Sequence, residues 1–252
     1  MTDKQDLYTY VLRQADNAMI LCQRLCQWAA RAPELEEDIA LTNIGLDMIG
    51  QARSLYQYAS ELSDTNTDED ELVFMRDERQ WSNFLLVEQP NGNFADTMAR
   101  QYFYDVWHFE FLKQLVNSAD QRLAEIAAKS VKEAKYHVRH SSTWLKRLGD
   151  GTELSKERMQ SGIDTMWLFT PEMFSTDAVD EKMLKAGIGV DLALVKNEWQ
   201  TQVQATLSEA KLRIPDDAFL QTGGRNGIHS QHMGYLLAEM QILPRSMPGL
   251  VW

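Results

Sequence analysis

Apolar residues recur every three or four positions through most of the chain, which is the period of an amphipathic α-helix. The first long stretch with this pattern covers about residues 7–30, and a second covers about 33–62. Two more follow at about 95–116 and 121–148, the latter ending before Gly149, a residue type that suits a helix C-terminus. Four long amphipathic segments predict a four-helix bundle.

The remaining helical segments are shorter. We expect helices over 153–169, 191–211 and 229–243, with Pro244 ending the last of them. Residues 72–87 have room for one or two short helices, and 181–189 gives a weaker helical pattern. Neither an internal repeat nor a strand pattern occurs. The sequence therefore predicts one all-α domain over 1–252, with a bundle at about 7–149 and a C-terminal helical cap at about 150–252.

The composition excludes some classes of binding partner. The 252 residues carry a formal net charge of −12, so the chain has no excess of Lys and Arg to neutralise a nucleic acid or an anionic membrane. No apolar run approaches the roughly 20 residues that a membrane span needs. Because the first residues are polar and carry no apolar signal core, we expect a cytoplasmic protein. Cys22 and Cys26 share one helical face with apolar residues, and we expect both thiols to be buried.

Each of the four predicted long helices also carries an ionisable residue on its apolar stripe. Asp16 and Asp47 lie on the first two, Asp105 precedes His108 on the third, and Glu133 precedes His137 on the fourth. A buried carboxylate must be paired, protonated or bound to a metal. This pattern raises the hypothesis of a ferritin-like di-iron bundle.

The pattern departs from a di-iron site in detail. Such a site takes a Glu from each of two helices and a Glu-x-x-His pair from each of the other two. No Glu-x-x-His occurs; Gly50 stands three residues after Asp47, and Tyr136 three after Glu133. The nearest match, Asp105 with His108, falls on the third helix, where a lone Glu is expected. We therefore favour a metal-free bundle whose acids meet cations. An Asp-rich di-iron enzyme and a single-ion site remain as alternatives. The expected cations are Arg53, Lys132, Lys135, Arg139 and the two histidines.

Two further features have two interpretations each. The Gly-rich loop 223–227, followed by His229 and His232, is either an anion-binding nest at a helix N-terminus or an exposed hairpin that clasps a partner; we favour the hairpin. Aromatic residues crowd the region from Trp81 to Phe111, and either some of them face a partner chain or all pack under the C-terminal cap.

Several long strings give the chain a resemblance to a known family. They are APELE at 32–36, NIGLD at 43–47 followed by GQAR at 50–53, RDERQ at 76–80, EQPNGNFAD at 88–96, KEAKYH at 132–137 and TGG at 222–224. With these strings the chain resembles the C subunits of bacterial 1,2-phenylacetyl-CoA epoxidase, the multicomponent monooxygenase of aerobic phenylacetate breakdown. The resemblance covers nearly the whole chain and is loosest around 64–71 and 177–190.

The resemblance implies a ferritin-like subunit that has lost its metal site and supports a homologous catalytic subunit. That partner would hold the di-iron centre, a small subunit would bridge the complex, and a reductase would carry FAD, an iron–sulfur cluster and the NADPH site. No cofactor is expected on this chain. The positions of the vestigial metal site are then Asp16, Asp47, Asp105, His108, Glu133, Tyr136 and His137. The expected contacts with a ligand or partner are Gln80, Trp81, Ser82, Asn83, Gly223, Gly224 and Arg225.

Overall fold

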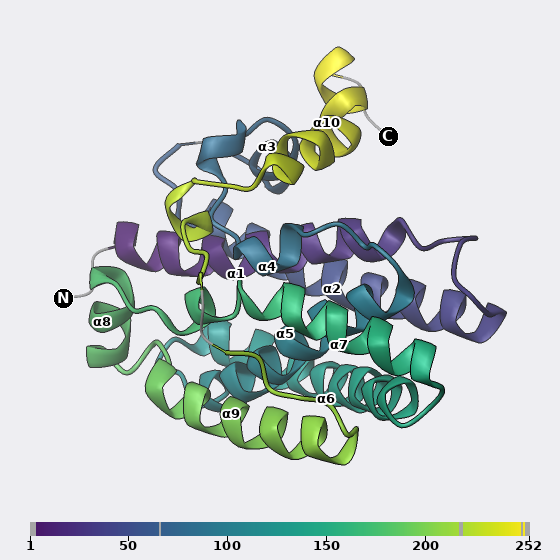
Figure 1. Ribbon diagram of the computed structural model, residues 1–252. Coiled ribbons are helices and arrows are strands. Elements are labelled where there is room, and N and C mark those ends of the chain that lie inside the picture. Colours follow the sequence, from purple (N-terminus) through teal and green to yellow (C-terminus); the bar gives the residue numbers. More distant parts are fainter. Residues whose placement is uncertain (1–3, 66, 217–218, 248, 250–252) are drawn as a thin grey trace.

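Two long helical hairpins form the body of the protein. The computed structural model describes residues 4–65, 67–216, 219–247 and 249. Helices α1 (Lys4–Cys26) and α2 (Leu35–Leu62) pack along each other, as do α5 (Phe94–Leu115) and α6 (Gln121–Gly149), and the two hairpins lie against one another (Figure 1). No strand occurs among the described residues, so the all-α, ferritin-like bundle with additional C-terminal helices is confirmed.

The connection between α1 and α2 begins earlier than the apolar pattern predicts. Helix α1 ends at Cys26 because the chain closes tight turns over the next residues, with Trp28 N donating to Leu25 O at 3.0 Å, and Ala30 adopts a φ of 63°. Cys22 is buried, but Cys26 lies at the end of the helix and is exposed. The prediction that both thiols are buried is therefore wrong for Cys26.

Helix α5 is the centre of the core. Tyr102, Phe103, Tyr104 and Trp107 are each at most 1% exposed, although they point in different directions around the helix. They are covered by α7 (Glu153–Trp167), α9 (Leu192–Glu209) and the short η2 (Pro171–Phe174). The indole of Trp107 also donates to the carbonyl of Met173 at 3.0 Å. The expectation that some of these aromatics face a partner chain is wrong, and packing under the C-terminal elements accounts for them.

The acidic connection after α2 already contains the start of a helix. Helix α3 (Glu69–Phe74) begins before residue 72, the expected start of the short helices, because Asp68 and Glu71 form a capping box, in which Glu71 N donates to Asp68 Oδ1 at 2.8 Å. Asn66 of this linker lies outside the described residues. The short elements η1 (Glu78–Gln80) and α4 (Leu85–Glu88) then lead into α5.

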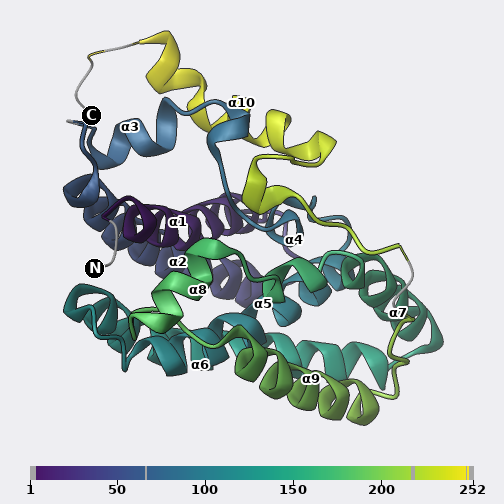
Figure 2. The ribbon, with the colours of Figure 1, turned by 90° about the vertical axis from the view of Figure 1, so that its left-hand side faces the viewer.

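The C-terminal part returns to the start of the chain. Helix α8 (Ala178–Lys185) packs on α1, and the short η3 (Gly224–Asn226) leads to α10 (Gln231–Ser246). Helix α10 rests on α3, and both lie beside α1, on the side away from α5 and α6 (Figures 1 and 2). Pro244 lies inside α10 rather than ending it: the helix lacks the hydrogen bond that an N–H at this position would donate, but it continues to Ser246, and Met247 N donates to Leu243 O at 3.1 Å. In the described part of the chain no helix is long and apolar enough to cross a membrane.

Candidate functional site

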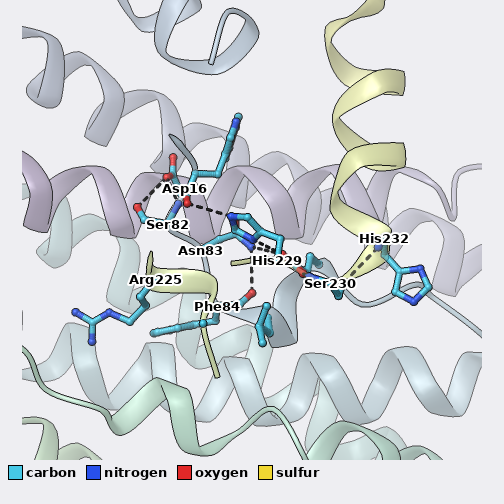
Figure 3. Close-up of polar contacts among 12 residues, drawn as sticks. Asp16, Ser82, Asn83, Phe84, Arg225, His229, Ser230 and His232 are labelled. Atoms are coloured by element: carbon cyan, nitrogen blue, oxygen red, sulfur yellow. Dashed lines mark hydrogen bonds and ion pairs between the residues drawn. The ribbon is translucent and has the colours of Figure 1, made fainter. Parts of the chain in front are cut away.

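The carboxylate of Asp16 is fully occupied by the chain's own groups. Asp16 is 0% exposed on α1, and the guanidinium of Arg76 donates to both of its oxygens, at 2.5 and 3.1 Å. Tyr56 adds its hydroxyl at 2.7 Å. Ser82 adds its backbone N–H at 2.9 Å and its hydroxyl at 3.0 Å, and Figure 3 shows it beside Asp16. Burial opposes the charge on Arg76, but Asp16 outweighs it and raises the pKa of this guanidinium. A metal ion would have to displace a buried, neutralising cation.

Two other candidate positions pair across α2 and α6. His137 Nε2 lies 3.0 Å from Asp47 Oδ2, and Gln51 Nε2 donates to Glu133 Oε2 at 2.8 Å. His137 is 0% exposed, whereas Asp47 and Glu133 are only partly buried. These bonds tie the second helix to the fourth, as expected for acids that fix the register of a bundle. Tyr136, the residue in the place of a second ligand, is 51% exposed and points away from the core.

Asp105 and His108 lie deeper, on α5. Asp105 is 2% exposed, and its Oδ2 has no hydrogen-bond partner among the described residues. Burial raises the pKa of Asp105 to about 6, against the opposing influence of His137. Burial, together with the nearby His137, lowers the pKa of His108 to about 3, so this imidazole is neutral at pH 7.

The candidate metal positions therefore divide into separate sets. Asp16 belongs to the Arg76 network, Asp47 and Glu133 bond across the α2–α6 seam, and Asp105 stays in the core. In the described ranges, no group of three or more His, Cys, Asp and Glu side chains is placed to hold a metal ion. The residues present do not fit a di-iron centre.

Most of the cations predicted to neutralise these acids lie on the surface and do not contact them. Arg53 pairs with Glu69 at 3.0 Å on the surface, and Lys132, Lys135 and Arg139 are exposed. Only His137 is an expected partner that does meet an inward acid. The sequence does not identify Arg76 as the partner of Asp16, because Arg76 lies in the short polar segment between the second and third long helices and is 60 positions from Asp16 in the chain.

The loop at 223–225 and the segment at 80–83 are the two regions expected to contact a ligand or partner, and the fold brings them together. Glu172 of η2 joins them: its carboxylate accepts from Leu85 N and Gly223 N, both at 2.8 Å, and from Arg225 N at 3.3 Å. The backbone N–H groups of Gly223 and Arg225, which the alternative interpretation assigned to an anion nest, thus bind the chain's own carboxylate. The hairpin clasps residues 79–85 of the same chain, and its glycines permit this, because a Cβ on Gly224 would lie 2.2 Å from the carbonyl oxygen of Asn83.

The side chains of these contact regions differ in accessibility. Trp81 and Asn83 are at most 1% exposed, Ser82 bonds to Asp16, and the guanidinium of Arg225 pairs with Asp180 at 2.6 Å. Gln80 is exposed, but its side chain caps η1 through Asp77 N at 2.7 Å. The assignment of this region to a ligand or a partner stays a prediction.

A second buried carboxylate lies beside this region and was missed from the sequence. Glu88 of α4 is 0% exposed and accepts from Ser230 N at 2.6 Å, from Asn83 Nδ2 at 3.0 Å and from His229 Nδ1 at 2.7 Å. The other ring nitrogen of His229 lies 3.0 Å from Trp81 O. Figure 3 shows the imidazole between Asn83 and Ser230. Burial opposes the charge on His229, but Glu88 outweighs it, and the pKa of His229 is raised.

The fold is that of an all-α protein of the ferritin-like class. It consists of two long helical hairpins, and its inward acids bond to side chains of neighbouring elements. Comparison with known proteins identifies the family more closely. The family described as phenylacetic acid catabolic protein matches residues 1–252. The chain is also 51% identical, over 246 residues, to the C subunit of the 1,2-phenylacetyl-CoA epoxidase of Escherichia coli (strain K12), covering 98% of this chain and 99% of that protein. The chain belongs to the phenylacetic acid catabolic protein family, and the resemblance noted in the sequence is confirmed.

Proposed function

We propose that this chain is the non-catalytic, structural C subunit of a 1,2-phenylacetyl-CoA epoxidase. The similarity to the C subunit of such an enzyme, over almost the full length of both chains, supports its place in a complex of this kind. The engagement of Asp16 by Arg76 is the observation that carries the non-catalytic role. A carboxylate that neutralises a buried guanidinium is not available to a metal.

In this proposal the chemistry belongs to other subunits. A homologous subunit holds the di-iron centre and uses dioxygen to epoxidise the ring of phenylacetyl-CoA. A reductase with FAD and an iron–sulfur cluster supplies electrons from NADPH, and a small subunit bridges the complex. The present chain carries none of these cofactors and acts by holding the catalytic subunit in a hetero-oligomer.

The test is metal analysis of each chain, before and after assembly. The two homologous subunits are purified separately and as a complex, and iron is quantified per chain. We expect about two irons on the partner, no stoichiometric iron on this chain, and epoxide formation only when the partner is present. Two irons per copy of this chain, purified alone, would overturn the proposal.

A variant separates a structural role from a catalytic one. His137→Asn removes the imidazole while keeping a donor of similar size near Asp47. For a structural subunit, turnover per assembled complex is unchanged and only stability or yield falls. Turnover abolished in a complex that still assembles would instead support a self-sufficient site that includes Asp105, His108 and Glu133.

A further inference from the structure

The exposed face of α6 is basic in an acidic protein. Residues 121–149 contain seven Lys and Arg but only two Asp and Glu, in a chain with 25 basic and 37 acidic residues. The exposed cations on successive turns are Arg122, Lys129, Lys132, Lys135 and Arg139. A cluster of this kind produces a local positive potential that differs in sign from the rest of the surface.

These cations also lack partners within the chain. Among the residues that the structure describes, none of the five forms an ion pair or a side-chain hydrogen bond. Several lysines elsewhere meet acids, such as Lys4 with Asp64 at 3.1 Å and Lys146 with Glu209 at 2.6 Å. Single exposed cations on other elements, such as Lys185 and Lys196, also form no ion pair among the described residues. What distinguishes α6 is that five such cations follow one another along a single helix, in a chain with an excess of acids.

An unpartnered apolar row runs along the neighbouring helix α2. Leu35, Ile39, Leu46 and Ile49 are 72%, 53%, 61% and 42% exposed. Their spacing of four, seven and three residues keeps them on one face of the helix, over about 20 Å at 1.5 Å per residue. Single exposed apolar residues are ordinary, but a contiguous row along a helix marks an interaction surface.

The two rows approach each other at one groove. This groove of about 320 Å³ lies between α2 and α6, and it is lined by Leu46 and Asp47 on one side and by Arg122, Glu125 and Lys129 on the other. The remaining residues of both rows lie outside the groove. Glu133 also lines it, through the bond to Gln51 described above. Apart from the backbone of α2 itself and the residues next to Gly50, no atom of the described residues lies within 4 Å of a Cβ placed on Gly50, so this wall is open to solvent. Tyr136, on α6, is also exposed.

We propose that this α2–α6 face is the docking surface for the homologous di-iron subunit, through a helical surface on that subunit that carries apolar residues flanked by acids. The inference rests on the proposed function and adds the location and chemistry of the contact. Charge complementarity selects an acidic partner, because burying the α6 row against neutral or basic residues would leave several cations unpaired.

Other occupants fit less well. In a symmetric dimer of this chain the same patch meets itself, which would set two basic α6 faces against each other. A nucleic acid would engage the cations but would leave the apolar row of α2 in water, and it would be repelled by the net charge of −12. A protein whose helical face carries both acids and apolar residues pairs with the cations of α6 and covers the apolar row of α2.

The test measures the affinity of surface variants for the purified di-iron subunit. One variant reverses the charge of the basic row (Lys132→Glu, Lys135→Glu, Arg139→Glu), and another places a charge in the apolar row (Leu46→Glu). The matched control alters exposed residues of α9 (Leu194→Glu, Lys196→Glu), where Leu194 is 55% exposed. Because every altered residue is on the surface, folding is expected to be preserved, and circular dichroism checks it.

We expect each α2–α6 variant to raise the dissociation constant at least about tenfold, a change typical of interface charges and anchors. The α9 control should stay within about twofold of the unaltered chain. Added salt should weaken binding of the unaltered chain and have less effect on the charge-reversed variant.

Each other result has a distinct meaning. If the unaltered chain does not bind the di-iron subunit, the proposed function fails, and this inference fails with it. If the unaltered chain binds and the α2–α6 variants bind equally well, only the docking surface is wrong. An equal loss in the α9 control, or self-association of this chain that Leu46→Glu abolishes, would also overturn the assignment of the surface to that partner.

Discussion

The imidazole of His229 lies between two acceptors, with Nδ1 2.7 Å from Glu88 Oε2 and Nε2 3.0 Å from the carbonyl oxygen of Trp81. Glu88 also accepts hydrogen bonds from Ser230 N and Asn83 Nδ2. A carbonyl oxygen only accepts, so the Nε2 of His229 donates to Trp81 O. The hydrogen bond and charge of Glu88 favour the protonated imidazole and raise the pKa of His229 against the effect of burial. This buried pair fixes the segment that leads into α10 against α4.

The first prediction concerns the pH dependence of this attachment. The folded pKa of His229 is raised above the unfolded value of about 6.5. Its contribution is therefore fully present below about pH 6.5 and is lost as the pH rises through the folded pKa. Besides Glu88, the carboxylate of Glu78 on η1 also favours the charged form. Hydrogen exchange of residues 231–246 should quicken relative to the bundle as the pH rises from 6 to 9, beyond the intrinsic increase measured on an unfolded peptide.

His229→Asn tests whether the His229–Glu88 pair causes this pH dependence, with His232→Asn, three residues on in the first turn of α10, as the control. The first variant leaves Glu88 without a buried counterion, and such a loss typically costs about 3–5 kcal/mol. It should expose α10 already at pH 6 and remove the pH dependence. His232 forms no ion pair in the described chain, and its replacement should change little. An unaltered pH response in the His229 variant would contradict the assignment.

The second prediction concerns Asp16 and Arg76. Asp16→Asn leaves the guanidinium buried and uncompensated, and we expect a loss of about 3–5 kcal/mol in the free energy of unfolding, measured in urea. Replacing Arg76 with Met in the same chain should recover part of the loss, because the two residues share one network.

The exposed pair Lys4 with Asp64 provides the comparison. Their side chains are 50% and 84% exposed, and Asp64→Asn should change stability by less than about 1 kcal/mol. A loss from Asp16→Asn as small as that from Asp64→Asn would mean that Asp16 does not hold Arg76 in place.

The helices were predictable because their apolar spacing is local information. The segments now assigned to α5 and α6 were placed to within about a residue at each end. The ends of α1 and α10 were less accurate, since an Ala with φ of 63° and a Pro in a last helical turn leave no distinctive pattern. The acids at Asp16 and Asp105 were correctly recognised as buried, since they interrupt apolar stripes.

The partners of these acids were not predictable, because they come from remote segments. Arg76 meets Asp16 across 60 positions, and His229 meets Glu88 across 141. Only the folded chain brings these loops together. The same holds for the aromatic residues of α5. Because they occur on all sides of the helix, something beyond the bundle must cover some of them, and α7 and α9 of the same chain do so.

The third prediction compares two glycines. A Cβ on Gly224 would lie 2.2 Å from the backbone oxygen of Asn83, so Gly224→Ala should displace the 223–230 segment, with a loss of about 1–3 kcal/mol or more from overpacking. Gly50→Ala meets open space in the middle of α2 and should be neutral or stabilise by up to about 1 kcal/mol. Thermal unfolding of both variants gives the comparison, and equal effects would contradict the close contact.

The fourth prediction distinguishes a relic acid from a working one. The folded pKa of Asp105, about 6, lies above the ordinary value of about 3.9, so the folded state binds the proton more tightly than the unfolded state. Stability therefore falls as the pH rises from about 4 to 6, and above that range the buried charge costs on the order of 3 kcal/mol. Asp105→Asn removes this charge without changing the size of the side chain. It should raise the melting temperature at pH 7.5 and do so much less at pH 4.5, while epoxidation by the assembled complex stays unchanged. A residue that served a metal would show the opposite result: little gain in stability at pH 7.5 and loss of turnover.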